Sequence, residues 1–345
     1  MDNAFIGTTL ASIAAAFLTG CGVTRAVVWA AQRWRILDLP NERSAHTCPI
    51  PTLGGLGVIS GFWAGVGVLL GSGQGKVLAE GSVWIMLGCT VVLLVLVFDD
   101  SGRPLKVGGK LTLQFLSVGC WLYWGPRFEW ISLPLVGKVA LGGWSWLVTA
   151  LWFIWLENIF NFMDGIDGMT AIQTMAVGCV LAACFWQLGN PLWQVAAILA
   201  AAAAGFLVFN FPPARIFMGD VGSVFIGFII AALGVLGEGS GLPLWIFVAI
   251  LGYYIFDSTY TIARRTLRGE NVLQAHRQHL YQQLDQRDWG HWRIDLWALL
   301  LTLLLAGGGY ICLSGWFTIG AGVIVAGGGV LIGTSLWLWH EEKGN

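Results

Sequence analysis

The stretch Phe217-Met218-Gly219-Asp220-Val221-Gly222-Ser223 lies between two strongly apolar segments of the chain. A carboxylate beside the hydrocarbon core of a membrane is costly unless it faces a cation or a polar cavity. Asp220 therefore has two interpretations. In the structural one, it caps a helix that begins at Val221, and the glycines allow close helix packing. In the functional one, it holds a cation at the edge of a membrane, and the rest of the chain has to decide between them.

The composition is that of a polytopic membrane protein. Of the 345 residues, 57% are hydrophobic and only 11% are charged, whereas a soluble domain has about 25% charged residues. So few polar side chains cannot coat a soluble globule of this size. The net charge of -1 gives no sign of a nucleic-acid partner, and we expect none. We predict an all-α fold, with residues 1–345 forming a single transmembrane domain.

Eleven apolar segments are candidates for membrane-spanning helices, each of which needs roughly 20 residues. Because the third, fourth and fifth are short, ten is the alternative count. The segments are Ala4–Ala31, Leu53–Ser72, Val83–Phe98, Leu111–Gly125, Trp144–Phe160, Met169–Leu188, Trp193–Phe209, Val221–Gly237, Leu244–Ile262, Ile294–Ser314 and Phe317–Trp339. The segment between the fourth and fifth, residues 127–139, has the composition of a short hairpin.

Lys and Arg are distributed unevenly between the loops. They gather in the loops that follow odd-numbered segments, whereas the opposite loops hold only Lys76, Arg127 and Lys138. Short loops rich in Lys and Arg lie on the cytoplasmic side, so we predict a periplasmic N-terminus and a cytoplasmic C-terminus. Every strong polar motif then faces the cytoplasm, in the loops 32–52, 99–110, 161–168, 210–220 and 263–293.

Asp99 and Asp100 follow directly after an apolar run. Two adjacent carboxylates at the end of a membrane helix repel each other, and the negative end of the helix dipole disfavours both. The two carboxylates therefore do not stabilise the helix. Binding a divalent cation or accepting a proton from a substrate would explain their position.

Asn158, Asn161, Asp164 and Asp167 recur every three residues. On a helix this spacing lines one face. A face of amides and carboxylates at the mouth of a membrane helix suits hydrogen bonding to a nucleobase, a ribose or hydrated Mg²⁺. The alternative interpretation is a solvated turn, which does not require so regular a period.

Two further loops carry histidine. His46 lies in the first polar loop, which we interpret either as an ordinary turn or as a cover over a site. His276, Arg277 and His279 lie in the last one, where they could bind phosphate oxygens or simply reflect the positive charge of a cytoplasmic loop. With Asp220 they complete a set of carboxylates and cations on one membrane face, the composition of a site where Mg²⁺ and a diphosphate meet.

Taken together, these motifs resemble a known family, the polyprenyl-phosphate N-acetylhexosamine-1-phosphate transferases. The resemblance rests on four patterns: Asp99-Asp100 with Lys110-Leu-Thr-Leu-Gln114, Asn161-Phe-Met-Asp164-Gly-Ile-Asp167-Gly168, Phe217-Met-Gly-Asp220-Val-Gly-Ser223 and His276-Arg-Gln-His279. They occur in the family's order between about Asp38 and Gln282.

The resemblance implies a multi-pass enzyme of the bacterial inner (cytoplasmic) membrane. Such an enzyme transfers a sugar-1-phosphate from a UDP-N-acetylhexosamine to undecaprenyl phosphate and releases UMP. It requires Mg²⁺, with Mn²⁺ as an alternative ion, and we leave a homodimer open. The implied catalytic residues are Asp99, Asp100 and Asp220, with Asp220 and Asp100 at the metal; the implied substrate-binding residues are Lys110, Asn158, Asn161, Asp164, Asp167, Phe217, His276, Arg277, His279 and His46.

The sequence of the last polar loop indicates which branch of the family the chain resembles. It reads His276-Arg-Gln-His279 in place of a run of adjacent histidines, which resembles the enzymes that start O-antigen and other surface polysaccharides. GlcNAc, FucNAc and QuiNAc all remain open as the sugar, as do a direct transfer and one through a phospho-enzyme. The alternative from another class is a cation-coupled secondary transporter, which would place charges near the midplane between repeated halves.

Overall fold

The computed structural model describes residues 3–38, 48–73, 82–101, 105–272, 274 and 276–344. Residues 39–47 of the first polar loop, including His46, lie outside the described residues. The helices are α1 (Asn3–Trp34), α2 (Gly55–Gly71), α3 (Ser82–Leu93), α4 (Val97–Asp100), α5 (Val107–Trp124), α6 (Ser145–Phe162), α7 (Met169–Gln187), α8 (Leu192–Asn210), α9 (Asp220–Gly239), α10 (Leu244–Ile250), α11 (Gly252–Leu267), α12 (Leu280–Asp285), α13 (His291–Leu313) and α14 (Phe317–Gly344).

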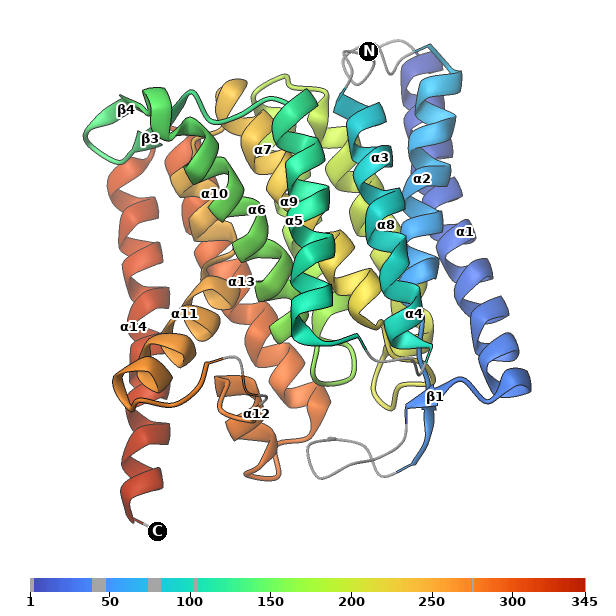
Figure 1. The fold of residues 1–345 in the computed structure, drawn as a ribbon. Coiled ribbons are helices and arrows are strands. Elements are labelled where there is room, and N and C mark those ends of the chain that lie inside the picture. Colours follow the sequence, from blue (N-terminus) through green and yellow to red (C-terminus); the bar gives the residue numbers. More distant parts are fainter. Residues whose placement is uncertain are drawn as a thin grey trace.

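Most of these helices run roughly side by side and form a bundle (Figure 1). All eleven predicted apolar segments coincide with helices. The third predicted segment combines α3, a short 3-10 turn over Leu94–Leu96 and α4. The ninth is not one straight helix, because α10 and α11 meet at an angle of 81°. The all-α membrane class is therefore confirmed, and the continuous ninth helix is wrong.

The length and composition of some of these helices are sufficient for them to cross a membrane. Within the described ranges, seven helices are long and apolar enough to span a membrane, or eight if α10 and α11 count as one span. The first helix begins at the upper end of the bundle and α14 ends at the lower end (Figure 1). That arrangement agrees with an odd number of crossings, while eleven crossings and the orientation stay predictions.

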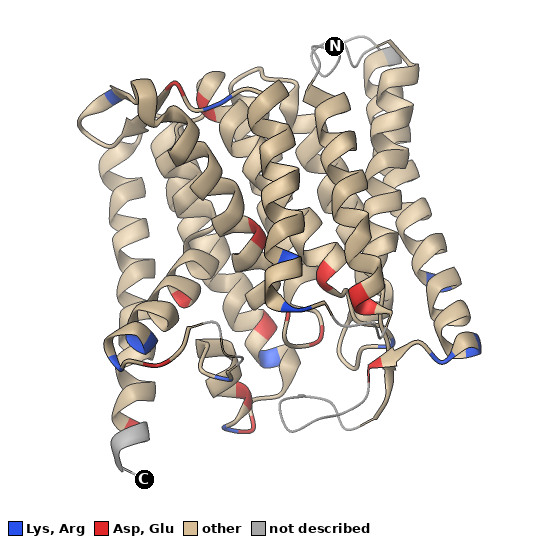
Figure 2. Ribbon diagram, viewed as in Figure 1, with Lys and Arg blue, Asp and Glu red and all other residues tan. Residues whose placement is uncertain are grey.

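Helix α9 occupies the centre of the bundle. Its residues from Val221 to Val235 are all buried, and it contacts α2, α3, α6 and α10. A helix that is apolar on every side is stable only when other elements surround it. Its first residue, Asp220, is therefore held at a fixed position. Most of the charged residues of the described chain lie toward the lower end of the bundle (Figure 2).

Two small antiparallel sheets complete the described fold. Strand β1 (Leu37–Asp38) pairs with β2 (Ile50–Pro51), and β3 (Trp130–Leu133) pairs with β4 (Gly137–Ala140). The second pair is the hairpin predicted for residues 127–139. It lies at the upper end of the bundle (Figure 1), where Ser132 donates a hydrogen bond of 2.5 Å to Glu238 near the end of α9.

Candidate active site

Three carboxylates converge at the lower end of α9. Asp99 and Asp100 come from α4, and Asp220 is the first residue of α9. Each offers one oxygen such that the three oxygens lie within 4.8 Å of one another, and all three residues are half-buried. Hard oxygen ligands grouped in this way are the ligands that Mg²⁺ prefers.

Asp100 holds the beginning of α9. Its two carboxylate oxygens accept hydrogen bonds from the backbone N–H groups of Asp220 (2.9 Å) and Val221 (3.0 Å). The first N–H groups of a helix have no partner within the helix, and here a residue 120 positions earlier supplies one. The structural interpretation of Asp220 as the cap of α9 is therefore wrong, because Asp100 performs that function and leaves the Asp220 side chain free to face the cluster.

Gly219 is required by this arrangement. Its φ of 78° and ψ of 167° fall in a region that is essentially restricted to glycine. A Cβ at this position would lie 2.5 Å from Oδ2 of Asp100. The glycine thus lets the backbone approach the carboxylate that caps the helix.

We expect Gly219→Ala to destabilise the protein by about 1–3 kcal/mol, from the strained backbone and the displaced cap. Gly239→Ala is the matched control, because a Cβ at this other end of α9 would meet no heavy atom within 4 Å. Thermal unfolding of the detergent-solubilised variants measures the difference. Equal melting temperatures for the two variants would show that Asp100 does not need the glycine.

Lys110 and Asn161 contact different oxygens of Asp220. Nζ of Lys110 lies 2.6 Å from Asp99 and 2.6 Å from Asp220. Nδ2 of Asn161 donates to Oδ1 of Asp220 at 2.9 Å and to the hydroxyl of Ser223 at 3.2 Å. The motifs that the sequence places in three separate loops thus meet at one point, and Asp220 is oriented through both of its oxygens.

The acidic residues after Asn161 do not continue one helical face. Helix α6 ends at Phe162, so Asp164 and Asp167 lie in the loop that leads to α7. Burial, with a smaller contribution from the charge of Asp220, raises the pKa of Asp164 to about 7. The regular spacing of three therefore reflects two helical residues followed by a turn, and only Asn158 and Asn161 belong to the helix.

Asp167 is joined to the last polar loop through a histidine. Its carboxylate accepts the N–H of Ala214 at 3.0 Å and lies 3.3 Å from Nδ1 of His291. Nε2 of His291 lies 3.4 Å from Asp285, which in turn pairs with Arg277 at 3.0 Å. Arg277 is thus committed to a protein carboxylate, and no sequence motif indicated that His291 would bridge the two loops.

His276 is neutral at physiological pH. Burial, with smaller contributions from the neighbouring His279 and Arg265, lowers its pKa to about 4, and Nδ1 accepts the N–H of Gln278 at 3.3 Å. It can therefore offer a substrate one N–H donor but no positive charge.

We expect His276→Gln, which retains an N–H donor, to leave the pH profile of the enzymatic reaction unchanged between about pH 5 and pH 8. The histidine is above its pKa throughout this interval, so its replacement removes no titration. Initial rates across the interval, for the wild type and the variant, test this. An inflection that disappears with His276 would contradict it.

The other predicted residues lie near the cluster or outside the described chain. Asn158 donates to Gln114 at 3.0 Å, a contact that the sequence did not suggest. The backbone N–H of Phe217 donates to the carbonyl of Pro51 at 2.8 Å, and its carbonyl accepts from Gly54 at 2.9 Å. The stretch before Asp220 is thereby joined to the residues just before α2, while the prediction for His46 is untested.

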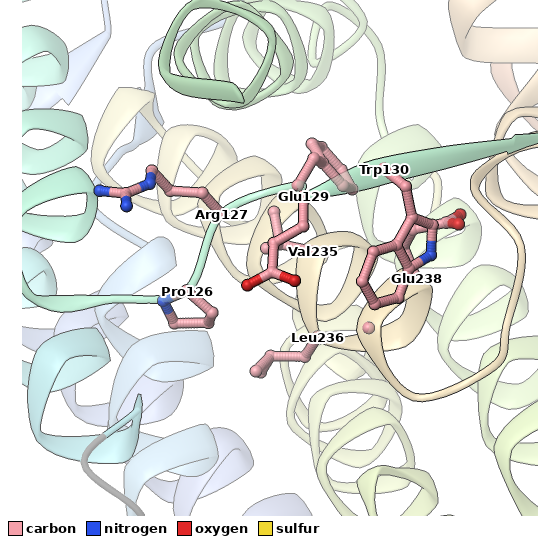
Figure 3. Close-up of a pocket in the computed structure, with 9 residues that line it drawn as sticks. Pro126, Arg127, Glu129, Trp130, Val235, Leu236 and Glu238 are labelled. Carbon is pink, nitrogen blue, oxygen red and sulfur yellow. The ribbon is translucent and has the colours of Figure 1, made fainter. Parts of the chain in front are cut away.

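A cavity of about 300 Å³ lies at the opposite end of α9. Its lining comes from residues 126–130 and from residues near the end of α9, including Val235, Leu236 and Glu238 (Figure 3). Along the helix axis, Glu238 is about 27 Å from Asp220 at 1.5 Å per residue. The cavity is thus remote from the carboxylate cluster and does not form part of the candidate active site.

Comparisons with known proteins identify a family and several relatives of the chain. The family model "Glycosyl transferase family 4" matches residues 83–238, which include the carboxylate cluster. A Bacillus subtilis protein named "Probable undecaprenyl-phosphate N-acetylglucosaminyl 1-phosphate transferase" is 30% identical over 72% of this chain and 69% of its own length. The decaprenyl-phosphate N-acetylglucosaminephosphotransferase of Mycobacterium tuberculosis is 28% identical over 89% and 81%. A phospho-N-acetylmuramoyl-pentapeptide-transferase of Levilactobacillus brevis is 29% identical over 66% and 73%.

Proposed function

The chain belongs to glycosyl transferase family 4, the polyprenyl-phosphate N-acetylhexosamine-1-phosphate transferases, and on that premise we propose its reaction. It transfers an N-acetylhexosamine-1-phosphate from a UDP-sugar to undecaprenyl phosphate and releases UMP. The observation that carries the proposal is the convergence of Asp99, Asp100 and Asp220 within 4.8 Å, with Lys110 between two of them.

The reaction exchanges one phosphorus–oxygen bond for another. An oxygen of the lipid phosphate attacks the sugar-bearing phosphorus of the UDP-sugar and forms the new bond. The bond from that phosphorus to the bridging oxygen breaks, and this oxygen leaves with UMP. A direct attack and a route through a phospho-enzyme give the same products.

The side chains divide this work. Lys110, on α5, supplies positive charge to phosphate oxygens at the cluster. The N-terminus of α9, already held by Asp100, favours negative charge beside it. Asp99 accepts a proton from the lipid phosphate or orients it. Asn161, Asp164 and Asp167 contact the nucleotide, Phe217 lies against the uracil, and the last polar loop contacts the diphosphate or sugar.

Mg²⁺ suits the donor set of the cluster. Asp220 and Asp100 would hold it, since a carboxylate oxygen that accepts one N–H retains a second lone pair. A divalent cation would neutralise the charge that develops on the phosphate oxygens. Mn²⁺ prefers the same oxygen ligands and is the alternative ion.

GlcNAc is the first sugar to test, because two of the similar proteins carry that sugar in their names. FucNAc and QuiNAc remain candidates. The sequence His276-Arg-Gln-His279 supports a product that begins O-antigen or another surface polysaccharide. An undecaprenyl phosphate acceptor and a cytosolic donor agree with an enzyme of the bacterial inner membrane.

A cation-coupled transporter is less consistent with the charge distribution. Such a protein binds its ions near the bilayer midplane. Most charged residues of the described chain lie toward the lower end of the bundle (Figure 2). A transferase explains why the charged residues lie toward one end of the bundle, because the lipid phosphate and the diphosphate of the UDP-sugar would meet at one membrane surface.

The test uses the purified protein in vesicles that contain undecaprenyl phosphate. UDP-GlcNAc, UDP-FucNAc and UDP-QuiNAc, each labelled in the sugar, are supplied with and without Mg²⁺. We expect UMP release and lipid-extractable label with one or more of them, and only with the metal. Label that reaches the vesicle lumen but never the lipid would support the transporter.

A further inference from the structure

Asp257 is a carboxylate buried where no motif of the family resemblance places one. It lies on α11, the second half of the bent helix pair, and its side chain has no exposed surface. Its Oδ1 accepts three hydrogen bonds: the backbone N–H of Leu280 (2.9 Å), Nδ1 of His279 (3.1 Å) and the hydroxyl of Thr261 (3.2 Å). A buried carboxylate is costly unless its surroundings stabilise it, and here most of the stabilisation comes from the last polar loop.

The contact with Asp257 decides which nitrogen of His279 carries the proton. A carboxylate can only accept, so Nδ1 donates to it and Nε2 is left as the second functional nitrogen. In the capping box of α12 the His279 side chain also faces the backbone N–H of Gln282, and within the described residues no hydrogen bond to Nε2 is formed. The atom that is free for a substrate is thus Nε2.

Aromatic rings fix the orientation of His279. The ring stacks on Tyr281, with centroids 5.8 Å apart and planes inclined by 20°, and it lies 6.2 Å from the ring of Phe162. Only 3% of the His279 side chain is exposed. The imidazole therefore has little freedom to rotate, and its direction depends on the hydrogen bond to Asp257.

The same loop contacts the nucleotide-binding motif directly. The hydroxyl of Tyr281 donates to the carbonyl of Phe162 at 3.0 Å. A Cβ on Gly165 would lie 2.0 Å from that hydroxyl oxygen, so the two loops are in close contact. Phe162 follows Asn161, which orients Asp220. A shift of His279 and its loop would thus displace residues next to the carboxylate cluster.

We propose that Asp257 is a positioning residue that acts through His279. It holds the imidazole as the Nδ1–H form and presents Nε2 to a phosphate or sugar oxygen of the bound UDP-sugar. The proposal rests on the proposed transferase function for its substrate, but the state of the histidine can be measured without turnover.

The first experiment compares Asp257→Leu, which removes the acceptor for Nδ1 of His279, with Ser258→Ala as a matched control. Ser258 is the next residue on α11, is equally buried, and its hydroxyl has no partner within the described residues. We expect Asp257→Leu to lower kcat/KM for the UDP-sugar by about 10- to 100-fold, as the loss of the carboxylate behind a metal-binding histidine does. Ser258→Ala should retain the wild-type value.

The second experiment separates positioning from a purely structural role. In an Asp257→Leu/His279→Asn double variant, we expect the same kcat/KM as in His279→Asn alone, because the carboxylate acts only through the ring. Equal losses from Asp257→Leu in both backgrounds would show that Asp257 merely supports α12, and would overturn the proposal.

The third experiment needs no activity. The chain has five histidines, so the imidazole ¹⁵N resonances of His279 can be assigned with the His279→Asn variant. We expect the Nδ1–H form in the wild type and its loss in Asp257→Leu, because leucine leaves Nδ1 without an acceptor. The same form in both proteins would overturn the inference even if the UDP-sugar assay failed, whereas a failed assay with the expected resonances would count against the proposed function alone.

Discussion

Asp220→Asn is expected to lower metal-dependent UMP release by at least about 100-fold and to raise the Mg²⁺ concentration needed for half-maximal rate. The substitution keeps the shape of the side chain but removes its charge. In the structure that charge is shared with Lys110 at 2.6 Å and oriented by Asn161 at 2.9 Å. Losses of 10- to 100-fold follow from removing groups that merely orient metal ligands, so the loss of a ligand should exceed them.

The control for this variant is Asp288→Asn. Asp288 is exposed and has a positive φ of 59°, a conformation that asparagine also tolerates, so folding and activity should be preserved. Initial rates of UMP release over a Mg²⁺ titration, from vesicles with undecaprenyl phosphate, provide the measurement. Wild-type rates and an unchanged Mg²⁺ dependence in Asp220→Asn would refute the assignment of a metal ligand to this residue.

Lys110→Gln is expected to have the opposite effect on the metal while also abolishing most of the activity. Without the lysine, the three carboxylates within 4.8 Å repel one another by roughly 3 kcal/mol per pair at an effective dielectric constant of about 20. A divalent cation relieves that repulsion, so the Mg²⁺ concentration for half-maximal rate should fall. The maximal rate should drop about 100-fold, because the lysine no longer supplies its positive charge to the phosphate oxygens beside the metal.

Lys106→Gln is the matched control, one helical turn earlier and exposed. It should change neither the rate nor the Mg²⁺ dependence by more than about twofold, since an exposed charge contributes little. The same titration measures both variants. A rise in the Mg²⁺ requirement of Lys110→Gln, parallel to that of Asp220→Asn, would mean that the lysine does not oppose the cation.

Much of this architecture follows from local sequence. Apolar runs located all eleven helical segments, and the paired carboxylates Asp99 and Asp100 were recognisable because the end of a membrane helix gives them no stabilisation. Asn161 and Asp220 were each singled out within their own motifs. These features are visible because each depends on neighbours a few residues away.

The contacts that sequence could not supply are those between distant segments. Nothing near Asp100 indicates that its oxygens would cap α9. Nothing near Arg277 indicates that Asp285 would occupy it, with His291 as the bridge to Asp167. The bend between α10 and α11 and the approach of Asp257 to His279 likewise depend on how the helices pack. Periodicity describes a single helix or strand and does not show where that element ends. The spacing therefore wrongly predicted that Asp164 and Asp167 lie on the same helical face as Asn161, whereas the helix ends at Phe162.

The cap on α9 also bears on the order in which the protein is made. Asp100 leaves the ribosome 120 residues before the N–H groups that it binds, a delay of about 6–24 s at 5–20 residues per second. During that interval α5, α6, α7 and α8 are synthesised, while the Asp100 carboxylate lacks the two N–H groups that it binds in the folded protein. The carboxylate cluster is thus completed late in biogenesis, and a nascent chain that stalls before Asp220 would carry Asp99 and Asp100 without the helix whose first N–H groups Asp100 binds.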